Sequence, residues 1–286
     1  MNITIRRGKP EDAKIGCGSI CYNAFATISQ AHNFPPDIPS PEIACNLLEW
    51  MLSHPHFYCV VALSGDRIVG SNVLDERNPI YGIGPITVDP GVQNTSVGRL
   101  LMDDVMGRVA AQEAPGVRLV QAAFHNRSLA LYTKLGFDVR EPLVCMQGAP
   151  LGVKLPGRSV RLAVEADIDA CNRVCRAVHG HDRGGELLDA IRHGTATVVE
   201  YGSRITGYAT VVGFFGHAVS ESNADLQALI GDAKAIAGPG FLLPSRNAEL
   251  FRWCLARGLR VIQPMTLMSL GLYNDPAGAF LPSITY

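Results

Sequence analysis

The chain has 286 residues, of which 47% are hydrophobic and 18% charged, with a formal net charge of −1. At roughly 100–200 residues per domain, this length suits two domains with sizeable cores. The near-neutral charge argues against a nucleic-acid partner. No apolar run reaches the roughly 18 residues that a membrane span needs, and the first residues lack the apolar core of a signal peptide. We expect a cytoplasmic protein with no membrane partner.

The eight cysteines are spread along the chain, and most have apolar neighbours. Cys17 with Cys21, and Cys171 with Cys175, are four residues apart on expected helices, a spacing that a metal site could use. Free cysteine is more often a buried small hydrophobe. The two His-x-His pairs have no third ligand at a convincing spacing. We therefore predict no metal site.

A strand followed by an amphipathic helix opens the chain and recurs in its second half. The segment IRRGKPEDAKIGCGSIC parallels VRLAVEADIDACNRVC, which matches Arg6 with Arg161 and Asp12 with Asp167, each 155 positions later. Such repetition indicates a duplicated structural unit.

Two further segments repeat in the same order. The hairpin sequence FYCVVALSGDRIVGSNV resembles TATVVEYGSRITGYATV, and a glycine-closed helix leading into a strand occurs as LALYTKLGFDV and FRWCLARGLRV. The offset between copies falls from 155 through 137 to 122, so the second copy has lost residues twice. We expect the first loss to be the Pro-rich loop and helix in QAHNFPPDIPSPEIACNLLEW, and the second to fall at VDPGVQNTSVGRLLM.

The stretch GAPLGVKLPGRS separates the two copies and is rich in glycine and proline. It predicts domains over 1–148 and 159–286, joined by a linker over 149–158. In the first domain, expected strands over 57–63, 67–74, 81–88 and 117–124 alternate with helices over 96–112 and 127–135. This order indicates an α/β fold with a mixed sheet.

The predicted helix over 96–112 has an apolar stripe with a polar loop before it. Val97, Leu101, Val105 and Val109 recur every four residues. The unpaired N–H groups of residues 94–98 and the helix dipole favour an anion, such as a pyrophosphate. Arg99 would add a cation there.

Just upstream, Pro85 interrupts the strand-like run YGIGPITV. Proline cannot donate to a sheet ladder, so we expect a bulge or a free edge. The N–H and C=O groups of Ile86 and Val88 could then pair with an extended ligand that carries amides. The run GIGPIT is a broken dinucleotide fingerprint, with Thr87 at its third glycine position, which argues against a Rossmann fold.

The motif VDPxxQxxxxGRxLM, followed by NRSLALYTKLGF, resembles the GNAT superfamily of N-acyltransferases. The resemblance covers most of residues 1–148. It implies two tandem GNAT-like domains, the second degenerate, each with a central mixed, splayed sheet flanked by helices. It also implies acetyl-CoA as the acyl donor, with its pantetheine along the strand that ends at Val88 and its pyrophosphate on the loop from Gln93 to Gly98.

The resemblance further implies site residues. Tyr132 matches the family's tyrosine that protonates the departing CoA thiolate; its alternative role is packing, with a hydroxyl that reaches solvent. The residues expected to bind the cofactor are Ile86, Thr87, Val88, Gln93, Asn94, Thr95, Ser96, Val97, Gly98, Arg99 and Asn126.

Attack of an amine on a thioester needs a neutral amine, a polarised carbonyl and a proton for the leaving sulfur. Strand N–H groups can polarise the carbonyl, and tyrosine can supply the proton. The base that takes the ammonium proton stays open, because Asp75, Glu76, Asp89, His125 and a water chain are all candidates.

Ser96 stands where the family pattern has its first loop glycine. We therefore expect a backbone φ that is not strongly positive, since glycine tolerates that region best. The hydroxyl would either cap the helix or donate to a phosphate oxygen. Gly98, the second loop glycine, would allow a ligand to approach closely.

The second half has no comparable loop, and Cys254 stands in the position of Tyr132. We expect that thiol in the core rather than as a nucleophile. The domain would then bind no CoA, and would complete the acceptor pocket or form a subunit interface, as in a homodimer. The apolar tail over 261–286 would pack in the core, between the domains or against a partner.

Together these features predict an acetyl-CoA-dependent N-acetyltransferase with one active site. The acceptor would be a small amine, because no charged groove for a macromolecule is evident, and the loop over 34–41 would cover it. The alternatives are a non-catalytic acyl-CoA-binding or regulatory protein, and a purely structural tandem domain.

Overall fold

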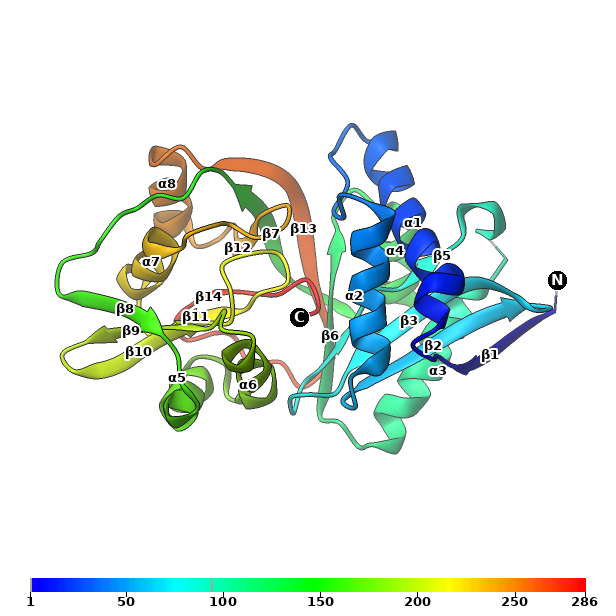
Figure 1. Cartoon of the computed structure of the whole chain (residues 1–286), viewed down its shortest axis with the longest axis horizontal. Coiled ribbons are helices and arrows are strands. Elements are labelled where there is room, and N and C mark those ends of the chain that lie inside the picture. Colours follow the sequence, from blue (N-terminus) through cyan, green and yellow to red (C-terminus); the bar gives the residue numbers. More distant parts are fainter. Residues whose placement is uncertain (1, 94) are drawn as a thin grey trace.

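The computed structural model describes residues 2–93 and 95–286. The two halves of the chain lie side by side, with long strands between them (Figure 1). In the view of Figure 1 the first half is on the right and the second on the left.

The first half follows the predicted order of strands and helices closely. Its elements are β1 (Ile3–Arg7), the π-helical η1 (Ala13–Cys17), α1 (Gly18–Ala31), α2 (Pro41–Ser53), β2 (Phe57–Ser64), β3 (Arg67–Asp75), β4 (Tyr81–Ile83), β5 (Thr87–Val88), η2 (Pro90–Val92), α3 (Val97–Ala111), β6 (Gly116–Ala122), α4 (Asn126–Lys134) and β7 (Asp138–Gln147).

The second half repeats the pattern, and several of its elements are shorter. They are β8 (Arg158–Leu162), η3 (Glu165–Asp167), α5 (Ile168–His179), α6 (Gly184–Arg192), β9 (Thr197–Tyr201), β10 (Arg204–Ala209), β11 (Ala218–Ser220), α7 (Asn223–Asp232), β12 (Phe241–Pro244), α8 (Ala248–Ala256), β13 (Arg260–Gly271) and β14 (Ala279–Leu281).

Helices cover both faces of the first-half sheet. On β2, Val60 and Ala62 belong to the apolar cluster that includes α3, whereas Cys59 and Val61 belong to the cluster that includes α1 and α2. This alternation follows from the two-residue period of a strand. The predicted mixed sheet flanked by helices is confirmed.

The predicted strand over 81–88 is divided at Gly84 and Pro85. Before the division, β4 pairs with β3 on one side and, in parallel, with β6 on the other. After it, β5 pairs with β3 alone. The sheet therefore splays where Pro85 predicted an irregularity.

The two halves exchange strands. The larger sheet runs β1-β2-β3-β4-β6-β13-β7-β12, with β5 beside β3, and the smaller runs β14-β11-β10-β9-β8. Strand β13 of the second half thus lies between β6 and β7 of the first, and β7 pairs with β12. The tail was expected to pack in the core, between the domains or against a partner. Its first strand, β13, lies between the two halves. The domain division at 149–158 stays a prediction, because strand pairing crosses it.

The internal repeat is visible as one ionic contact made twice. Arg6 donates to both carboxylate oxygens of Asp12, at 2.7 and 2.8 Å, and Arg161 does the same to Asp167, at 2.7 and 2.9 Å. Each aspartate also accepts from a backbone N–H three residues earlier in the chain. These equivalent contacts support a duplicated unit.

One expectation about the repeat is wrong. The helix between the opening helix and the hairpin is not unique to the first half, because α6 takes the place of α2. The second copy is shorter in part because residues 180–183 connect its two helices where 32–40 do so in the first half. Both of its helices, α5 and α6, are also shorter than α1 and α2. The similarity was hidden because α6 starts with two glycines where α2 starts with proline.

The paired cysteines are core residues. Cys17, Cys21, Cys171 and Cys175 are buried free thiols. Burial raises the pKa of Cys17 and of Cys171 to about 12. Over 2–93 and 95–286, no three His, Cys, Asp or Glu side chains are grouped as a metal site would need.

Across the same residues, the helices are too short or too polar to cross a membrane.

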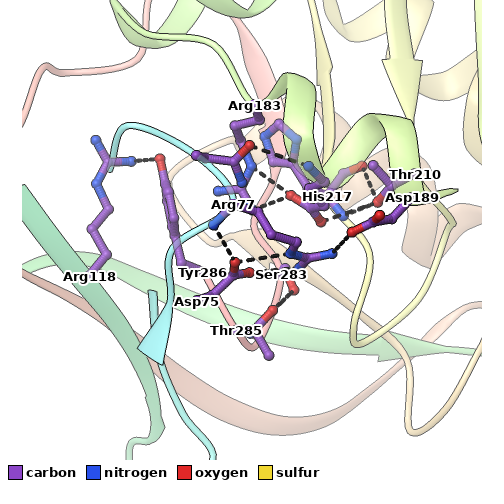
Figure 2. A network of polar contacts seen from close by, with 12 residues as sticks. Asp75, Arg77, Arg118, Arg183, Asp189, Thr210, His217, Ser283, Thr285 and Tyr286 are labelled. Atoms are coloured by element: carbon purple, nitrogen blue, oxygen red, sulfur yellow. Dashed lines mark hydrogen bonds and ion pairs between the residues drawn. The ribbon is translucent and has the colours of Figure 1, made fainter. Parts of the chain in front are cut away.

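A buried polar network joins the halves near the end of the chain (Figure 2). Arg77 donates to Asp75 of the first half and, at 3.0 Å, to Asp189 of the second. The Tyr286 hydroxyl contacts Arg118, and the guanidinium of Arg183 lies 4.1 Å from the Tyr286 ring. The network holds the final segment of the chain against the first-half sheet.

Candidate functional site

A cavity of about 370 Å³ opens where the first-half sheet splays. Residues of α1, the β4–β5 bend, the start of α3 and α4 surround it. Two predicted residues, Thr95 and Asn126, are exposed outside this lining, and Asn94 lies outside the described residues. The predicted residues that line it are Ile86, Thr87, Val88, Gln93, Ser96, Val97, Gly98, Arg99 and Tyr132.

Strand β5 presents an open edge to this cavity. Thr87 is paired with Ser71, and the N–H of Asp89 donates to the carbonyl of Val69 at 2.9 Å. Backbone groups alternate in direction along an antiparallel strand, so the N–H and C=O of Val88 face away from β3. They are therefore directed to the splayed side, where an amide-bearing ligand could pair with them.

The first turn of α3 lies beside that edge. The N–H groups at the start of a helix have no partner within the helix, and its dipole favours an anion. Val97 is buried, whereas Gly98 is partly open to the cavity. The arrangement suits a phosphate group at the end of a ligand that runs along β5.

Ser96 departs from expectation. Its backbone has φ 66° and ψ 3°, in the left-handed region, so the prediction that φ is not strongly positive is wrong. The turn into α3 thus keeps a backbone shape that suits glycine, at a cost of about 1–2 kcal/mol for an L-residue. The hydroxyl does not cap the helix, which leaves donation to a phosphate as the remaining prediction.

Gly98 is not required by packing within the protein. A Cβ built there would lie 3.7 Å from Val88 Cγ2 and 3.8 Å from Leu131 Cδ2, which are ordinary van der Waals distances. Its missing side chain instead leaves space on the cavity side of α3. Gly98 therefore bears on a ligand more than on the fold.

Two arginines lie at the rim. Arg99 is paired with Asp103 at 2.7 Å, and both side chains are about half exposed. Arg127, which the sequence reasoning missed, donates to Gln93 Oε1 at 2.7 Å and also lines the cavity. Its position beside Asn126 in the second motif was the available signal. Two guanidinium groups therefore lie where an anionic part of a ligand could be bound.

Tyr132 is buried on α4 and lines the cavity, with its ring centroid 6.3 Å from that of Phe137. Burial raises the pKa of its hydroxyl to about 12, against a smaller opposing effect of a hydrogen bond with Ser128. The phenol therefore keeps its proton at neutral pH. Its burial does not agree with the alternative in which the hydroxyl reaches solvent.

The base candidates differ in position. Asp75, Glu76 and Asp89 each pair with an arginine, and the described lining includes none of them. His125 does line the cavity, but its Nδ1 accepts the N–H of Ser128 at 3.0 Å, and burial lowers its pKa. With Nδ1 so occupied, the neutral ring carries its proton on Nε2 and is a donor there.

The comparisons with known proteins bear on this arrangement. Residues 23–137 match the acetyltransferase (GNAT) family model. That segment contains the splayed strand, the start of α3 and Tyr132. The chain therefore carries a GNAT-family domain.

Solved structures extend the GNAT fold to both halves. A candidate acetyltransferase from Pyrococcus horikoshii has a TM-score of 0.74 at 18% identity, with 97% of this chain and 94% of that chain covered. A GCN5-related N-acetyltransferase from Sphaerobacter thermophilus has a TM-score of 0.61 at 16% identity, with 96% of each chain covered. A tandem GNAT protein from the clavulanic acid biosynthesis pathway has a TM-score of 0.57 at 14% identity, with 94% and 98% covered. No curated protein matches the sequence. The chain has the tandem GNAT fold.

The second half contributes a wall to the cavity of the GNAT-family domain. Its lining residues are mainly apolar, and the sequence reasoning identified none of them individually. Residues 284 and 285 reach the cavity because Tyr286 is anchored in the network of Figure 2. The lining residues from this half are Phe214, Phe215, Met265, Ile284 and Thr285.

The corresponding features of the second GNAT unit differ. Cys254, opposite Tyr132 in the repeat, is fully buried, and burial raises its pKa to about 12. The first turn of α7 is capped by Ser222, whose hydroxyl accepts the N–H of Asp225 at 3.3 Å, and Asp225 is itself buried. The helix start that faces the cavity in the first half is thus satisfied by protein groups in the second.

Proposed function

We propose that the chain is an N-acetyltransferase that moves the acetyl group of acetyl-CoA onto the amine of a small acceptor by direct attack. The observation that carries this proposal is that Val88, the start of α3 and Tyr132 meet in one cavity of a GNAT-family domain. The strand edge would hold the donor's amides, the helix start would hold its phosphates, and the protonated phenol would supply the proton that the leaving sulfur needs.

The cavity residues fit acetyl-CoA. Its pantetheine amides would pair with the open edge of β5, and its pyrophosphate would lie on the first turn of α3, near Ser96 and Arg99. The contacts of Asn94, Thr95 and Asn126 with the cofactor are part of this proposal. No metal takes part in it.

In the proposed reaction, N–H groups of the β5 edge polarise the thioester carbonyl. The neutral amine attacks the carbonyl carbon, and the C–S bond breaks. Tyr132 gives its proton to the CoA sulfur. General acid catalysis of this kind contributes typically 10²–10⁴-fold to the rate.

The second GNAT unit would bind no acetyl-CoA, because its helix start is capped and Cys254 replaces the phenol. We assign it a structural part in the acceptor side of the cavity.

A thiol-release assay tests the proposal. The full chain is incubated with acetyl-CoA and a panel of primary amines, and free CoA thiol is measured together with the mass of the acetylated amine. Amine-dependent release supports an enzyme. Tight binding of acetyl-CoA with no release from any amine would favour a non-catalytic acyl-CoA-binding protein.

A further inference from the structure

Asp37 is a buried carboxylate in the wall of the cavity. Its residue is 8% exposed and lies on the connection between α1 and α2. Phe34 of the same connection stacks on Phe124, with ring centroids 4.4 Å apart. Asp37 is therefore a buried residue of a connection that packs against the rest of the protein.

Asp37 has a hydrogen-bond donor but no cation. Gln263 of β13 donates from Nε2 to the Asp37 carboxylate. Its charge also raises the pKa values of two buried thiols, Cys21 on α1 and Cys145 on β7. In the described part of the chain, no Lys, Arg or His forms an ion pair with it.

An ionised carboxylate in such a place is costly unless a cation joins it. Burial raises the pKa of Asp37 to about 6, against the lowering effect of Gln263. The wall around it is largely apolar and includes Phe25 and Ile28 of α1, with Phe214 and Met265 of the second half. The missing partner is thus a positive group on the ligand.

We propose that Asp37 binds the ammonium group of the acceptor and takes its proton, and that the acceptor is a primary amine on a compact apolar body. This inference rests on the proposed N-acetyltransferase function. Asp37 contacts the substrate, and Gln263 is a positioning residue that acts through it. The second half of the chain thereby supplies part of the acceptor site.

The protons balance as follows. The ammonium gives one proton to the Asp37 carboxylate, which leaves a neutral amine. A C–N bond forms at the acetyl carbon and the C–S bond breaks, while Tyr132 gives its proton to sulfur. The nitrogen then loses a second proton to the Tyr132 phenolate, and Asp37 returns its proton to solvent. The products are the acetylated amine, CoA thiol and one proton.

Gln121 of β6 gives independent support for a polar ligand group in this cavity. It lines the cavity, and both its amide oxygen and its amide nitrogen are buried without a partner in the described chain. A bound acceptor could satisfy these atoms, which otherwise remain costly.

The test uses the full chain with Asp37→Asn, Gln263→Leu and the control Glu42→Gln. Glu42 is an exposed carboxylate on the first turn of α2, so its substitution removes the same charge outside the cavity. The probes are 2-phenylethylamine and its neutral analogue 2-phenylethanol, titrated in the presence of CoA from pH 5 to pH 9. Acetyl transfer to 2-phenylethylamine is measured on the same samples.

We expect Asp37→Asn to weaken amine binding at least tenfold at pH 7.5 and to lower kcat/KM at least a hundredfold, with alcohol binding unchanged. Gln263→Leu should shift the pH profile of kcat/KM, and Glu42→Gln should match the wild type. Equal amine binding by wild type and Asp37→Asn, or an amine that binds no better than the alcohol, would overturn the inference. Acetyl-CoA that fails to bind the wild type would instead overturn the proposed function.

Discussion

Gln263 and Asp37 are 226 positions apart in the chain, yet the amide of one donates a hydrogen bond to the carboxylate of the other. The contact exists because β13 is inserted between β6 and β7. One wall of the candidate acceptor site therefore depends on a strand from the far half of the sequence. The two halves share one sheet and line one cavity.

A chain cut after residue 148 should not be a working domain. Without β13, the facing edges of β6 and β7 lose their partners, and open edges of this kind promote aggregation. We expect residues 1–148 to be largely insoluble, and co-expression with residues 149–286 to restore soluble protein in one complex. Size-exclusion chromatography measures the state of the 1–148 fragment and the formation of the complex. A monodisperse 1–148 fragment that binds acetyl-CoA would contradict this account of the exchanged strand.

Removing the charge of Asp37 should stabilise the unliganded protein at high pH. Its pKa of about 6 in the folded state exceeds the ordinary 3.8, so ionisation destabilises the fold as pH rises through that interval. At pH 8, Asp37→Asn should raise the free energy of unfolding by roughly 2–3 kcal/mol, since one pKa unit corresponds to about 1.4 kcal/mol. At pH 4 the two proteins should unfold alike. Urea denaturation of both proteins at pH 8 and at pH 4 tests this prediction. Equal free energies of unfolding at pH 8 would mean that the carboxylate already has a partner.

The sequence predicted the local elements of the first half well, because each carried its own signal. Alternating β-branched residues marked β2 and β3, a four-residue stripe marked α3, and Pro85 marked the splay. Ser96 was mispredicted because a left-handed residue other than glycine is rare, and the turn here accepts its cost. Helix α6 was missed because glycines hid its likeness to α2.

Features formed by segments far apart in the chain could not be predicted from the sequence. No local pattern shows that β13 enters the first sheet, since a strand's partner depends on the whole topology. Asp37 looked like a loop residue in a Pro-rich stretch, and its hydrogen-bond partner Gln263 comes from a distant strand. The part of the wall supplied by Met265 of β13 follows from the same exchange.

Tyr132→Phe should separate chemistry from binding. The phenylalanine ring keeps the packing on α4 but removes the proton donor, so we expect the rate of acetyl transfer to fall about a hundredfold or more. The dissociation constant for acetyl-CoA should stay within about twofold, because the lost hydroxyl acts on the leaving sulfur. Steady-state kinetics gives the rate of acetyl transfer, and calorimetry on the same preparation gives the dissociation constant for acetyl-CoA. Unchanged turnover would exclude Tyr132 as the acid.

Substitutions at positions 96 and 98 should differ in their effect on acetyl-CoA affinity. Ser96→Gly relieves a left-handed backbone, so stability should rise by up to about 1 kcal/mol. Its acetyl-CoA affinity should change less than about threefold. Thermal unfolding and calorimetry measure the two effects.

Gly98→Leu should weaken binding at least about a hundredfold by filling the space beside α3. Gly98→Ala is the matched control for folding, because its Cβ would have ordinary contacts at 3.7 and 3.8 Å. Equal effects of Ser96→Gly and Gly98→Leu on affinity would show that the first turn of α3 does not hold the ligand.

The most direct measurement is an isothermal titration of the full chain with acetyl-CoA, read for the number of sites. The account predicts one site per chain, retained in Cys254→Ala and lost in Gly98→Leu. Two sites per chain, or none, would contradict it.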